Sequence, residues 1–299
     1  MTVAPKAAGR GIDWGLVGRY AALILLGFLF IFPIVFMFMS SLKPDDELLR
    51  DTTSLRAFLP GENPSLNNYT GVFERVPVGR FLFNSMLIST ITVVIGIVIN
   101  SMAGFAIARM KWRGSTVILS IILATFILPF ETVAIPLLFV VSRLPTIGFE
   151  NGLPVLETGW LNTYHVQIFP FIANAFSIFL FVQYFKSLPV ELDEAAKIDG
   201  ASWFTIYRKI IMPISGPVVA TVAILTFLPI WNQYVWPLIT VQSEEVRPAI
   251  IGVSYFFQLD PAWGELMAYL TMLTVPVLLL FLALQRTFVE SIAASGVKG

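Results

Sequence analysis

The stretch from Tyr20 to Ser40, YAALILLGFLFIFPIVFMFMS, contains no charged residue. A helix that rises about 1.5 Å per residue covers roughly 30 Å over this length, which is the thickness of the apolar core of a bilayer. A cleaved signal peptide would have a shorter apolar region and a cleavage site of small residues, whereas Lys43, Pro44 and Asp45 follow here. The stretch therefore predicts an uncleaved first membrane span.

The composition of the whole chain supports the same class. Of its 299 residues, 57% are hydrophobic and 13% are charged, whereas soluble proteins are about 45–50% apolar. The chain has no Cys, which excludes disulfides and Cys-based metal sites. Its net charge is zero with no basic tract, so nothing indicates a nucleic-acid partner, and we expect no metal at the single His165. We predict an all-α integral membrane protein in the lipid bilayer.

Five further apolar runs follow the first, and each predicts one transmembrane span. Prolines are expected to break the later spans: Pro129, Pro136, Pro170, Pro229, Pro237 and Pro276. The six predicted spans are about 20–40, 81–108, 117–141, 166–185, 217–241 and 266–284. Twelve of the 19 Lys and Arg residues lie before the first span, after the last, or in the loops after the second and fourth spans. The positive-inside rule then predicts that both termini and the loop 186–216 are cytoplasmic.

This topology divides the chain into three parts and leaves three loops on the outer side. Residues 1–19 are a predicted cytoplasmic segment, residues 20–289 the transmembrane domain, and residues 290–299 a cytoplasmic tail. The outer loops are 42–80, 142–165 and 242–265.

The 186–216 loop is far more charged than its surroundings and predicts two short helices. Ser187 is the expected N-cap of the first helix, and Pro189 suits its first turn. The acids Glu191, Asp193 and Glu194 follow where the helix dipole favours negative charge. An apolar stripe is expected from Leu192, Ala195, Ala196 and Ile198.

Gly200 permits a bend or a left-handed backbone between the two helices. The second helix is expected to start near Ser202 and to end at Pro213. Its apolar face is predicted to hold Trp203, Ile206, Tyr207, Ile210 and Ile211. Either the hairpin lies in the lipid headgroups, or it docks on a protein. The acidic first helix favours docking, because anionic lipid repels it.

The spacing of residues in this loop resembles a known signature. Glu194-Ala195-Ala196, then Gly200, Ile210 and Met212-Pro213 resemble the EAA…G…I-LP motif of binding-protein-dependent ABC importer permeases, with Met212 in place of the usual Leu.

Two further stretches resemble one branch of that family. The stretch WNQYVWPL from Trp231 to Leu238 is similar to the WN-x-x-x-WPL segment of carbohydrate permeases of the maltose-transporter type. The ending Gly296-Val297-Lys298-Gly299 is similar to that of the same group.

The resemblance implies the role of the loop and the partners of the chain. The loop is expected to be a coupling helix that docks on a cytoplasmic ATPase subunit. The residues expected to couple are Glu191, Glu194, Ala195, Ala196, Asp199, Gly200, Ala201, Ile210 and Pro213. The expected partners are a distinct second permease, two ATP-binding subunits and an extracytoplasmic sugar-binding protein. The chain has no G-x-x-x-x-G-K-[ST] phosphate loop, so we expect ATP and Mg on the partner, no cofactor on this chain, and no enzymatic activity of its own.

The substrate path is predicted from a few polar and aromatic residues near prolines. Glu131 is the main intramembrane acid. We expect either a substrate or proton group or, preferably, a residue at the outer lip of a pore or in a contact between helices. Aromatic faces and amides suit a neutral sugar, which predicts a path along Trp231, Asn232, Gln233 and Tyr234.

Other residues in the spans have expected structural roles. Trp236 is expected in an aromatic belt at the outer interface. Asn84, Asn100 and Asn174 are expected to make interhelical hydrogen bonds, and the spacing of Asn100, Gly104 and Ala108 predicts close helix packing.

The sequence thus predicts the permease subunit of an ATP-driven sugar importer in the cytoplasmic membrane. An importer of the same class for glycerol phosphate or a polyol is an alternative, but no cationic group inside the spans favours a phosphate. An ion-coupled secondary transporter or a membrane scaffold is a further alternative, although the spans lack the titrating relay that ion coupling requires.

Overall fold

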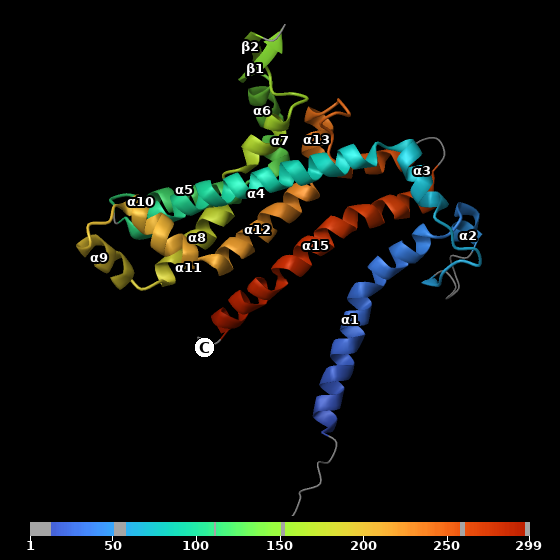
Figure 1. Cartoon of the computed structure of the whole chain (residues 1–299), viewed down its shortest axis with the longest axis horizontal. Coiled ribbons are helices and arrows are strands. Elements are labelled where there is room, and N and C mark those ends of the chain that lie inside the picture. The colour runs from blue at the N-terminus through green and yellow to red at the C-terminus, as the bar shows by residue number, and fades with distance from the viewer. Residues whose placement is uncertain (1–12, 51–57, 111, 151–152, 258–260, 297–299) are drawn as a thin grey trace, which may run out of the picture. The chain divides into compact units, whose positions relative to one another are not determined.

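The computed structural model describes residues 13–50, 58–110, 112–150, 153–257 and 261–296. The first twelve residues of the predicted amino-terminal segment and the last three of the predicted carboxy-terminal ending lie outside the described residues. Where it is described, the chain is mostly helical, with one short β-hairpin (Figure 1). The helices and strands, in chain order, are α1 Trp14–Ser41, α2 Asp45–Arg50, α3 Asn67–Arg75, α4 Val78–Arg109, α5 Ser115–Phe126, α6 Phe130–Val141, β1 Pro145–Glu150, β2 Leu153–Thr158, α7 Tyr164–Ile168, η2 Phe169–Phe171, α8 Ala175–Ser187, α9 Glu191–Ile198, α10 Trp203–Ile206, η3 Tyr207–Ile211, α11 Met212–Ile214, α12 Gly216–Trp231, α13 Val235–Thr240, α14 Ala249–Gly252, η4 Val253–Phe257 and α15 Trp263–Gly296.

Three described helices are individually long and apolar enough to cross a membrane. They are α1, α4 and the part of α15 from Trp263 to Ala283. The number rises to six if each of three sharply bent helix pairs is counted as one span. The predicted spans 20–40, 81–108 and 266–284 each lie inside a single helix.

The predicted span 117–141 is broken at Pro129, as expected. α5 ends at Phe126 and α6 begins at Phe130, with an angle of 99° between them. Pro129 has an extended backbone and stands directly before α6. Because a proline ring disfavours the helical conformation of the residue before it, Leu128 cannot readily continue α5 into α6.

The predicted spans 166–185 and 217–241 are also interrupted. In the first, η2 separates α7 from α8, and the two parts meet at 41°. In the second, α12 ends at Trp231 and α13 begins at Val235. Pro229 lies inside α12 and does not interrupt it.

Residues 1–74 and 259–272 form one compact unit. In its described part, α1 begins at Asp13, whose carboxylate accepts from the Gly15 amide at 3.0 Å, and it exposes apolar side chains over most of its length, as a lipid-facing helix does. The Asn68 amide donates to the Ser41 and Lys43 carbonyls at 2.9 and 2.7 Å. These bonds join the end of α1 to the beginning of α3.

Residues 75–258 and 273–299 form the second compact unit. In it, α4 packs against α8 and α12 (Figure 1). A Cβ added to Gly104 would lie 2.6 Å from the Phe181 Cβ, so α4 and α8 approach closely at this point. The Asn100 side chain donates to the Ile172 carbonyl at 3.0 Å and accepts from the Asn174 amide at 2.9 Å. The predicted packing at Gly104 and the bridging role of Asn100 are confirmed.

Asn84 also has the predicted bridging role. Its amide donates to the carbonyls of Glu245 and Arg247, both at 2.9 Å, and its oxygen accepts from the Tyr164 hydroxyl at 2.7 Å. The prediction for the side chain of Asn174 is wrong: it caps α8 by accepting from the Ser177 amide at 2.9 Å.

The 142–165 loop contains the hairpin, which the sequence did not predict. Strand β1 pairs antiparallel with β2, from Pro145 opposite Thr158 to Glu150 opposite Leu153. The indole of Trp160 donates to the Pro145 carbonyl at 3.0 Å and closes the base of the hairpin.

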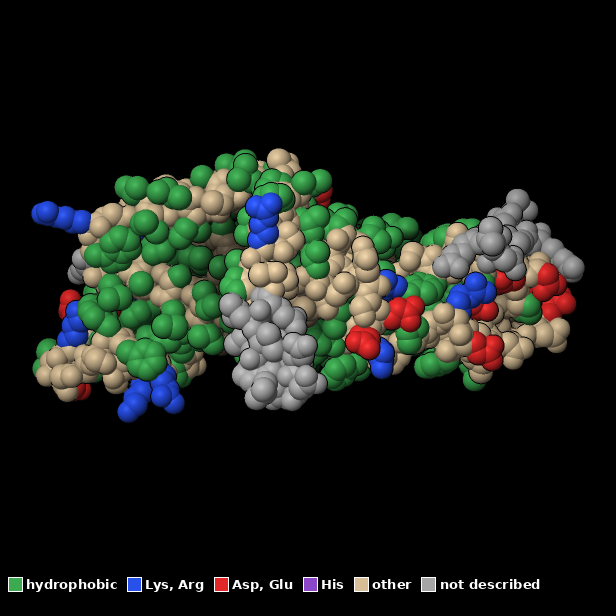
Figure 2. All heavy atoms as spheres, turned by 90° about the horizontal axis from the view of Figure 1, so that it is seen from above, with side chains coloured by type: hydrophobic (Ala, Val, Ile, Leu, Met, Phe, Trp, Pro, Cys, Tyr) green, Lys and Arg blue, Asp and Glu red, His purple; other side chains and the backbone are tan. Residues whose placement is uncertain are grey.

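Apolar side chains make up much of the visible surface, and Lys and Arg side chains project from the end that carries α9 and α10 (Figure 2). This distribution matches apolar helices that are solvated by lipid and a charged segment, around α9 and α10, that is solvated by water.

Candidate functional site

The 186–216 segment is a series of short helices between α8 and α12. Two expectations for its start are wrong. Ser187 ends α8, where its hydroxyl donates to a carbonyl of the same helix at 2.8 Å, and α9 begins at Glu191, two residues after Pro189. Because a residue before proline favours an extended backbone, Leu188 has ψ of 145° and separates the two helices.

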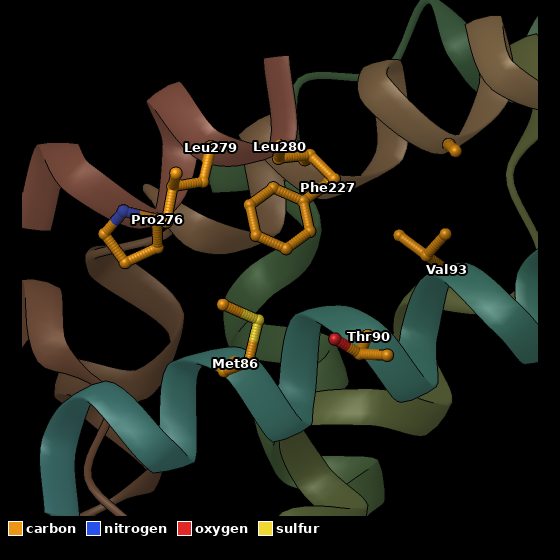
Figure 3. Close-up of a pocket in the computed structure, with 8 residues that line it drawn as sticks. Met86, Thr90, Val93, Phe227, Pro276, Leu279 and Leu280 are labelled. Carbon is orange, nitrogen blue, oxygen red and sulfur yellow. The ribbon is translucent and has the colours of Figure 1, made fainter. Parts of the chain in front are cut away.

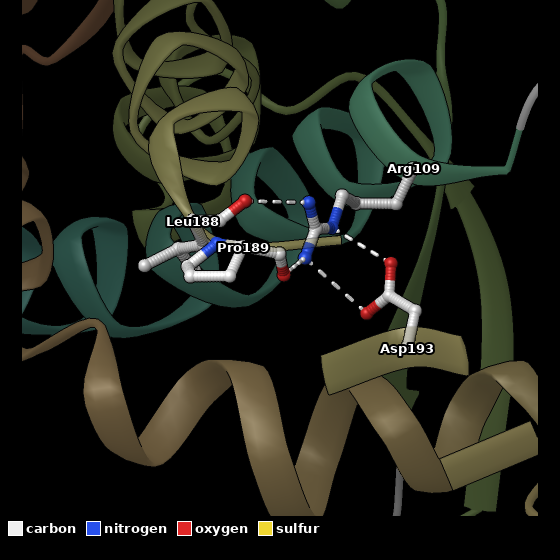
Figure 4. Close-up of polar contacts among 4 residues, drawn as sticks. All are labelled: Arg109, Leu188, Pro189 and Asp193. Atoms are coloured by element: carbon white, nitrogen blue, oxygen red, sulfur yellow. Dashed lines mark hydrogen bonds and ion pairs between the residues drawn. The ribbon is translucent and has the colours of Figure 1, made fainter. Parts of the chain in front are cut away.

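A buried arginine fixes the junction of α8 and α9 (Figure 4). Arg109 is the last residue of α4, and its Nη1 and Nη2 donate to the Leu188 and Pro189 carbonyls at 3.0 and 2.9 Å. Its Nε lies 2.8 Å from Oδ2 of Asp193, and both side chains are 5% exposed. The guanidinium therefore neutralises a buried acid in the first turn of α9 and satisfies carbonyls at the end of α8.

Gly200 ends α9 in a left-handed conformation, as predicted, with φ of 77°. The Ala201 amide donates to the Ala196 carbonyl at 2.9 Å, and the Gly200 amide donates to the Lys197 carbonyl at 3.0 Å. These are the two hydrogen bonds of a Schellman motif, in which glycine carries no penalty for a positive φ.

The second half of the segment begins at Ser202, as predicted. The Ser202 hydroxyl accepts from the Thr205 amide at 3.2 Å and caps α10. The helical stretch ends at Ile214, one residue after the expected end at Pro213. Pro213 lies in the last turn of the continuous helical stretch Trp203–Ile214, directly after the π-helical turn η3.

The predicted apolar face of this second half is confirmed. Ile206, Tyr207 and Ile211 are buried in a cluster that includes Phe105, and Trp203 and Ile210 pack against it. The Tyr207 hydroxyl lies 2.8 Å from the Ser101 hydroxyl of α4 in a buried hydrogen bond. The second half of the segment is therefore packed on the bundle through both apolar and polar contacts.

The predicted apolar stripe of α9 is wrong in part. Asp193 and Ala196 face the bundle, while Ala195 and Ile198 are exposed. The exposed residues share one face at the helical spacing of three and four: Glu191, Glu194, Ala195 and Ile198. Asp199 is exposed as well, and Ile198 keeps 87% of its surface accessible. The outer face of α9 thus combines acids with an uncovered apolar side chain.

The residues predicted for the substrate path surround the break between α12 and α13. Trp231 is buried and stacks on Phe227, with ring centroids 5.4 Å apart. Asn232 is exposed, and its amide donates to the Leu228 carbonyl at 2.9 Å. Gln233 is half-buried and Tyr234 exposed. In this conformation Trp231 offers no ring face to a ligand, whereas Asn232 and Tyr234 are accessible.

Glu131 lies in the first turn of α6, directly after the bend, and is exposed. The dipole of α6 favours an acid at this position. Among the residues that the structure describes, no three His, Asp or Glu side chains gather as metal ligands would.

The expectation that Trp236 lies in an interfacial belt is wrong. Trp236 is fully buried, and its indole donates to the Val166 carbonyl at 2.7 Å. The rings of Phe130 and Phe171 meet it edge-on at 5.8 and 6.1 Å. The side chain therefore joins α13 to α6 and to the turn before α8.

A cavity of about 460 Å³ lies between α4, α12 and the middle of α15 (Figure 3). Met86, Thr90 and Val93 line it from α4, and Pro276 and Leu279 from α15. From α12, Ala223 and Phe227 complete the wall with Leu280 of α15. Thr90 brings the one hydroxyl among these eight side chains, so the cavity by itself suits an apolar group better than a sugar.

Three charged or polar side chains form a network in the segment between α13 and α15. The Tyr255 hydroxyl donates to Oε1 of Glu244 at 2.6 Å, and Nη1 of Arg247 donates to the Tyr255 hydroxyl at 2.5 Å. Burial raises the pKa of Tyr255, the hydrogen bond to Glu244 adds to the rise, and the charge of Arg247 opposes it.

Residues 93–293 match the family described as binding-protein-dependent transport system inner membrane component. The chain belongs to this family. It is the membrane permease of an ABC importer, a multi-pass protein of the inner membrane, and a transport subunit rather than an enzyme.

Curated relatives and solved structures agree with this assignment. The chain is 32% identical to the arabinooligosaccharides transport system permease protein AraQ of Halalkalibacterium halodurans, across 96% of this chain and 97% of the relative. It is 30% identical to the sn-glycerol-3-phosphate transport system permease protein UgpE of Agrobacterium fabrum, across 90% of this chain and 93% of the relative. A crystal structure of a bacterial ABC transporter that imports the acidic polysaccharide alginate has the same fold, with a TM-score of 0.76 at 20% identity over 95% of this chain and all of that one.

Two residues of this permease that organise the 186–216 segment were not predicted as a pair. Asp193 was expected as an acid of the first turn, and Arg109 is one of the basic residues that follow the second predicted span, but their buried contact was not predicted. The signal was present, because Arg109 ends a span and Asp193 lies in the loop assigned to the same side of the membrane.

Proposed function

We propose that this permease carries a sugar or oligosaccharide across the cytoplasmic membrane, driven by ATP hydrolysis in separate subunits. In the proposed topology, six spans, three of them bent, leave both termini and the 186–216 segment in the cytoplasm. A second, distinct permease, two ATP-binding subunits and an extracytoplasmic binding protein complete the importer.

The observation that carries the coupling role is the exposed face of α9. An anchored helix that leaves Glu194, Ala195 and an 87% exposed Ile198 uncovered has a surface suited to a groove on another protein. The acids at its start would be repelled by anionic lipid. ATP-driven closure of the two ATP-binding subunits would displace α9 and rock the bundle between inward-open and outward-open states.

The sugar cargo is supported by the AraQ relative and by the aromatic and amide side chains around Asn232. Glycerol phosphate is the second candidate, because the UgpE relative is nearly as similar. A phosphate needs a cationic partner, and the predicted path along Trp231, Asn232, Gln233 and Tyr234 contains no cationic side chain. This favours a neutral cargo.

Charge reversal on α9 tests the docking surface. In Glu194→Lys, we expect the ATP-binding subunits to be lost on affinity purification of the permease from detergent. The matched control is Glu245→Lys, which reverses an exposed acid in the segment after α13. Equal recovery of the ATP-binding subunits with both variants would contradict docking through α9. The cargo is tested by uptake of labelled arabino-oligosaccharide and glycerol 3-phosphate into ATP-loaded proteoliposomes.

A further inference from the structure

One face of α4 contacts three helical parts of the 186–216 segment in turn, η3, α10 and α9. Ser101, Phe105 and Arg109 are spaced by four residues and so lie on the same side of α4. Ser101 bonds to Tyr207 of η3, and the ring of Phe105 lies 6.1 Å from that of Trp203 in α10. Arg109 pairs with an acid of α9. About 12 Å of one helix, at 1.5 Å per residue, thus spans the contacts with η3, α10 and α9.

The attachment of α9 to this face depends on few side chains. Asp193 and Ala196 are its buried residues, and the Asp193 contact is made by Arg109. A buried ion pair is a poor source of stability, because apolar residues of the same volume often stabilise a core as well or better. Its directional geometry, however, fixes the position of α9 relative to α4 in a way that an apolar contact does not.

The covalent connections of α9 are less suited to fixing its position. An extended Leu188 precedes it, and Gly200 with φ of 77° follows it. Single residues of this kind absorb changes of dihedral angle and act as hinges. A displacement of α9 would therefore be partly lost in these two turns unless a side chain tied α9 directly to the bundle.

We propose that Arg109 is a positioning residue that makes α9 and α4 move as one body when the ATP-binding subunits displace α9. The proposal rests on the proposed coupling role of α9. The forked guanidinium of Arg109 is suited to holding α9 in place, because it binds the Leu188 and Pro189 carbonyls and the Asp193 carboxylate at the same time.

The chain has no Cys, so two introduced cysteines can be spin-labelled without interference from native thiols. The substitutions are Lys197→Cys on α9 and Val94→Cys on α4, and both positions are exposed. The assembled importer, with cysteine-free partners, is measured in nanodiscs without nucleotide and with a non-hydrolysable ATP analogue. We expect the same distance distribution in both states for the labelled parent. In Arg109→Gln we expect the distance distribution to shift or broaden when the nucleotide binds. Asp193→Asn and Arg109→Lys should show smaller changes of the distribution. The matched control Arg113→Gln should show no change.

Several results would overturn the proposal. One is a nucleotide-dependent shift in the parent, and another is an unchanged distribution in Arg109→Gln. If Arg109→Gln, Arg109→Lys and Asp193→Asn all fail to assemble while Arg113→Gln assembles, the pair serves folding and not transmission. Failure of the proposed docking is a separate result, because it appears as undiminished recovery of the ATP-binding subunits with Glu194→Lys.

Discussion

Gly104 offers the sharpest test of how α4 and α8 pack. A Cβ at this position would lie 2.6 Å from the Cβ of Phe181 and 3.3 Å from the backbone nitrogen of Val182. Neither atom can be moved by a change of rotamer, because both are fixed to the backbone of α8. Gly104→Ala therefore forces the two helices apart by about 1 Å, the shortfall from ordinary carbon–carbon contact.

The cost of this separation can be isolated with a second alanine on the same helix. Gly79 also lies in α4, and a Cβ there meets nothing within 4 Å. Alanine is favoured over glycine inside a helix by about 1 kcal/mol, and both variants gain this term. Overpacking a close contact costs about 1–3 kcal/mol. The difference in the free energy of unfolding between Gly104→Ala and Gly79→Ala should therefore be about 1–3 kcal/mol.

The assay is thermal unfolding of the purified permease in detergent, followed by the loss of the monodisperse peak in size exclusion. For a domain of this size, about 1 kcal/mol shifts Tm by roughly 2–4 °C. Gly104→Ala should melt several degrees below Gly79→Ala. If Gly104→Ala melts with or above its control, the close approach of α4 and α8 does not constrain this bundle.

Three further predictions concern the turns and the polar contacts of the second unit. Gly200→Val should lower the free energy of unfolding by about 1–3 kcal/mol. Nothing lies within 4 Å of the added Cβ, so the left-handed φ is the source of this cost. Uptake should fall while membrane insertion persists, and normal uptake would contradict a hinge at this point. Asn84→Leu removes the hydrogen bonds from the Asn84 amide to the carbonyls of Glu245 and Arg247. Each carbonyl that stays buried without a donor lowers the free energy of unfolding by about 1–3 kcal/mol. Limited proteolysis should therefore cut the 242–257 segment faster in the variant than in the parent. The pKa of Tyr255 is raised above its ordinary value of 10.0. The protonated hydroxyl therefore stabilises the fold fully below pH 10.0, and this stabilisation is lost as the pH rises through the pKa of the folded state. In an absorbance titration of tyrosinate, Tyr255→Phe should lose one late-titrating group.

The sequence predicted the elements whose signals are local. The uninterrupted apolar runs gave α1 and α4, and the change of pattern at Gly200 gave the left-handed end of α9. The residues that face the bundle in the second half of the 186–216 segment, such as Ile206 and Ile211, followed from helical periodicity. Each of these features depends on residues within a few turns of one another.

The interruptions of the spans were predicted only in part. Prolines were expected to break the later spans, and Pro129 does so. Pro229 and Pro276, however, lie inside intact helices. The difference lies in whether the groups that a proline frees find other partners in the bundle, and this depends on neighbours that the local sequence does not identify.

Trp236 was misplaced for a related reason. A tryptophan near the end of an apolar run is typical of the interface, where the indole nitrogen reaches water. Here the Val166 carbonyl takes the place of water, because Pro170, four residues further on, has no amide hydrogen to donate to it and leaves the acceptor free for the indole. A buried tryptophan needs such an acceptor, and the acceptor lies 70 residues away in the chain.

The contact between Arg109 and Asp193 is less predictable than the local elements but more predictable than the acceptor of Trp236. The partners are 84 residues apart, so no periodicity connects them. The predicted topology nevertheless brings the end of the second span and the 186–216 loop to one side of the membrane. An acid that turns toward the bundle from a short helix requires a cation at the end of a neighbouring span, and Arg109, the last residue of α4, stands closer to the apolar run than Arg113 does. Span ends and inward-facing loop charges, considered together, therefore narrow the partner of Asp193 to very few arginines before any coordinates are known.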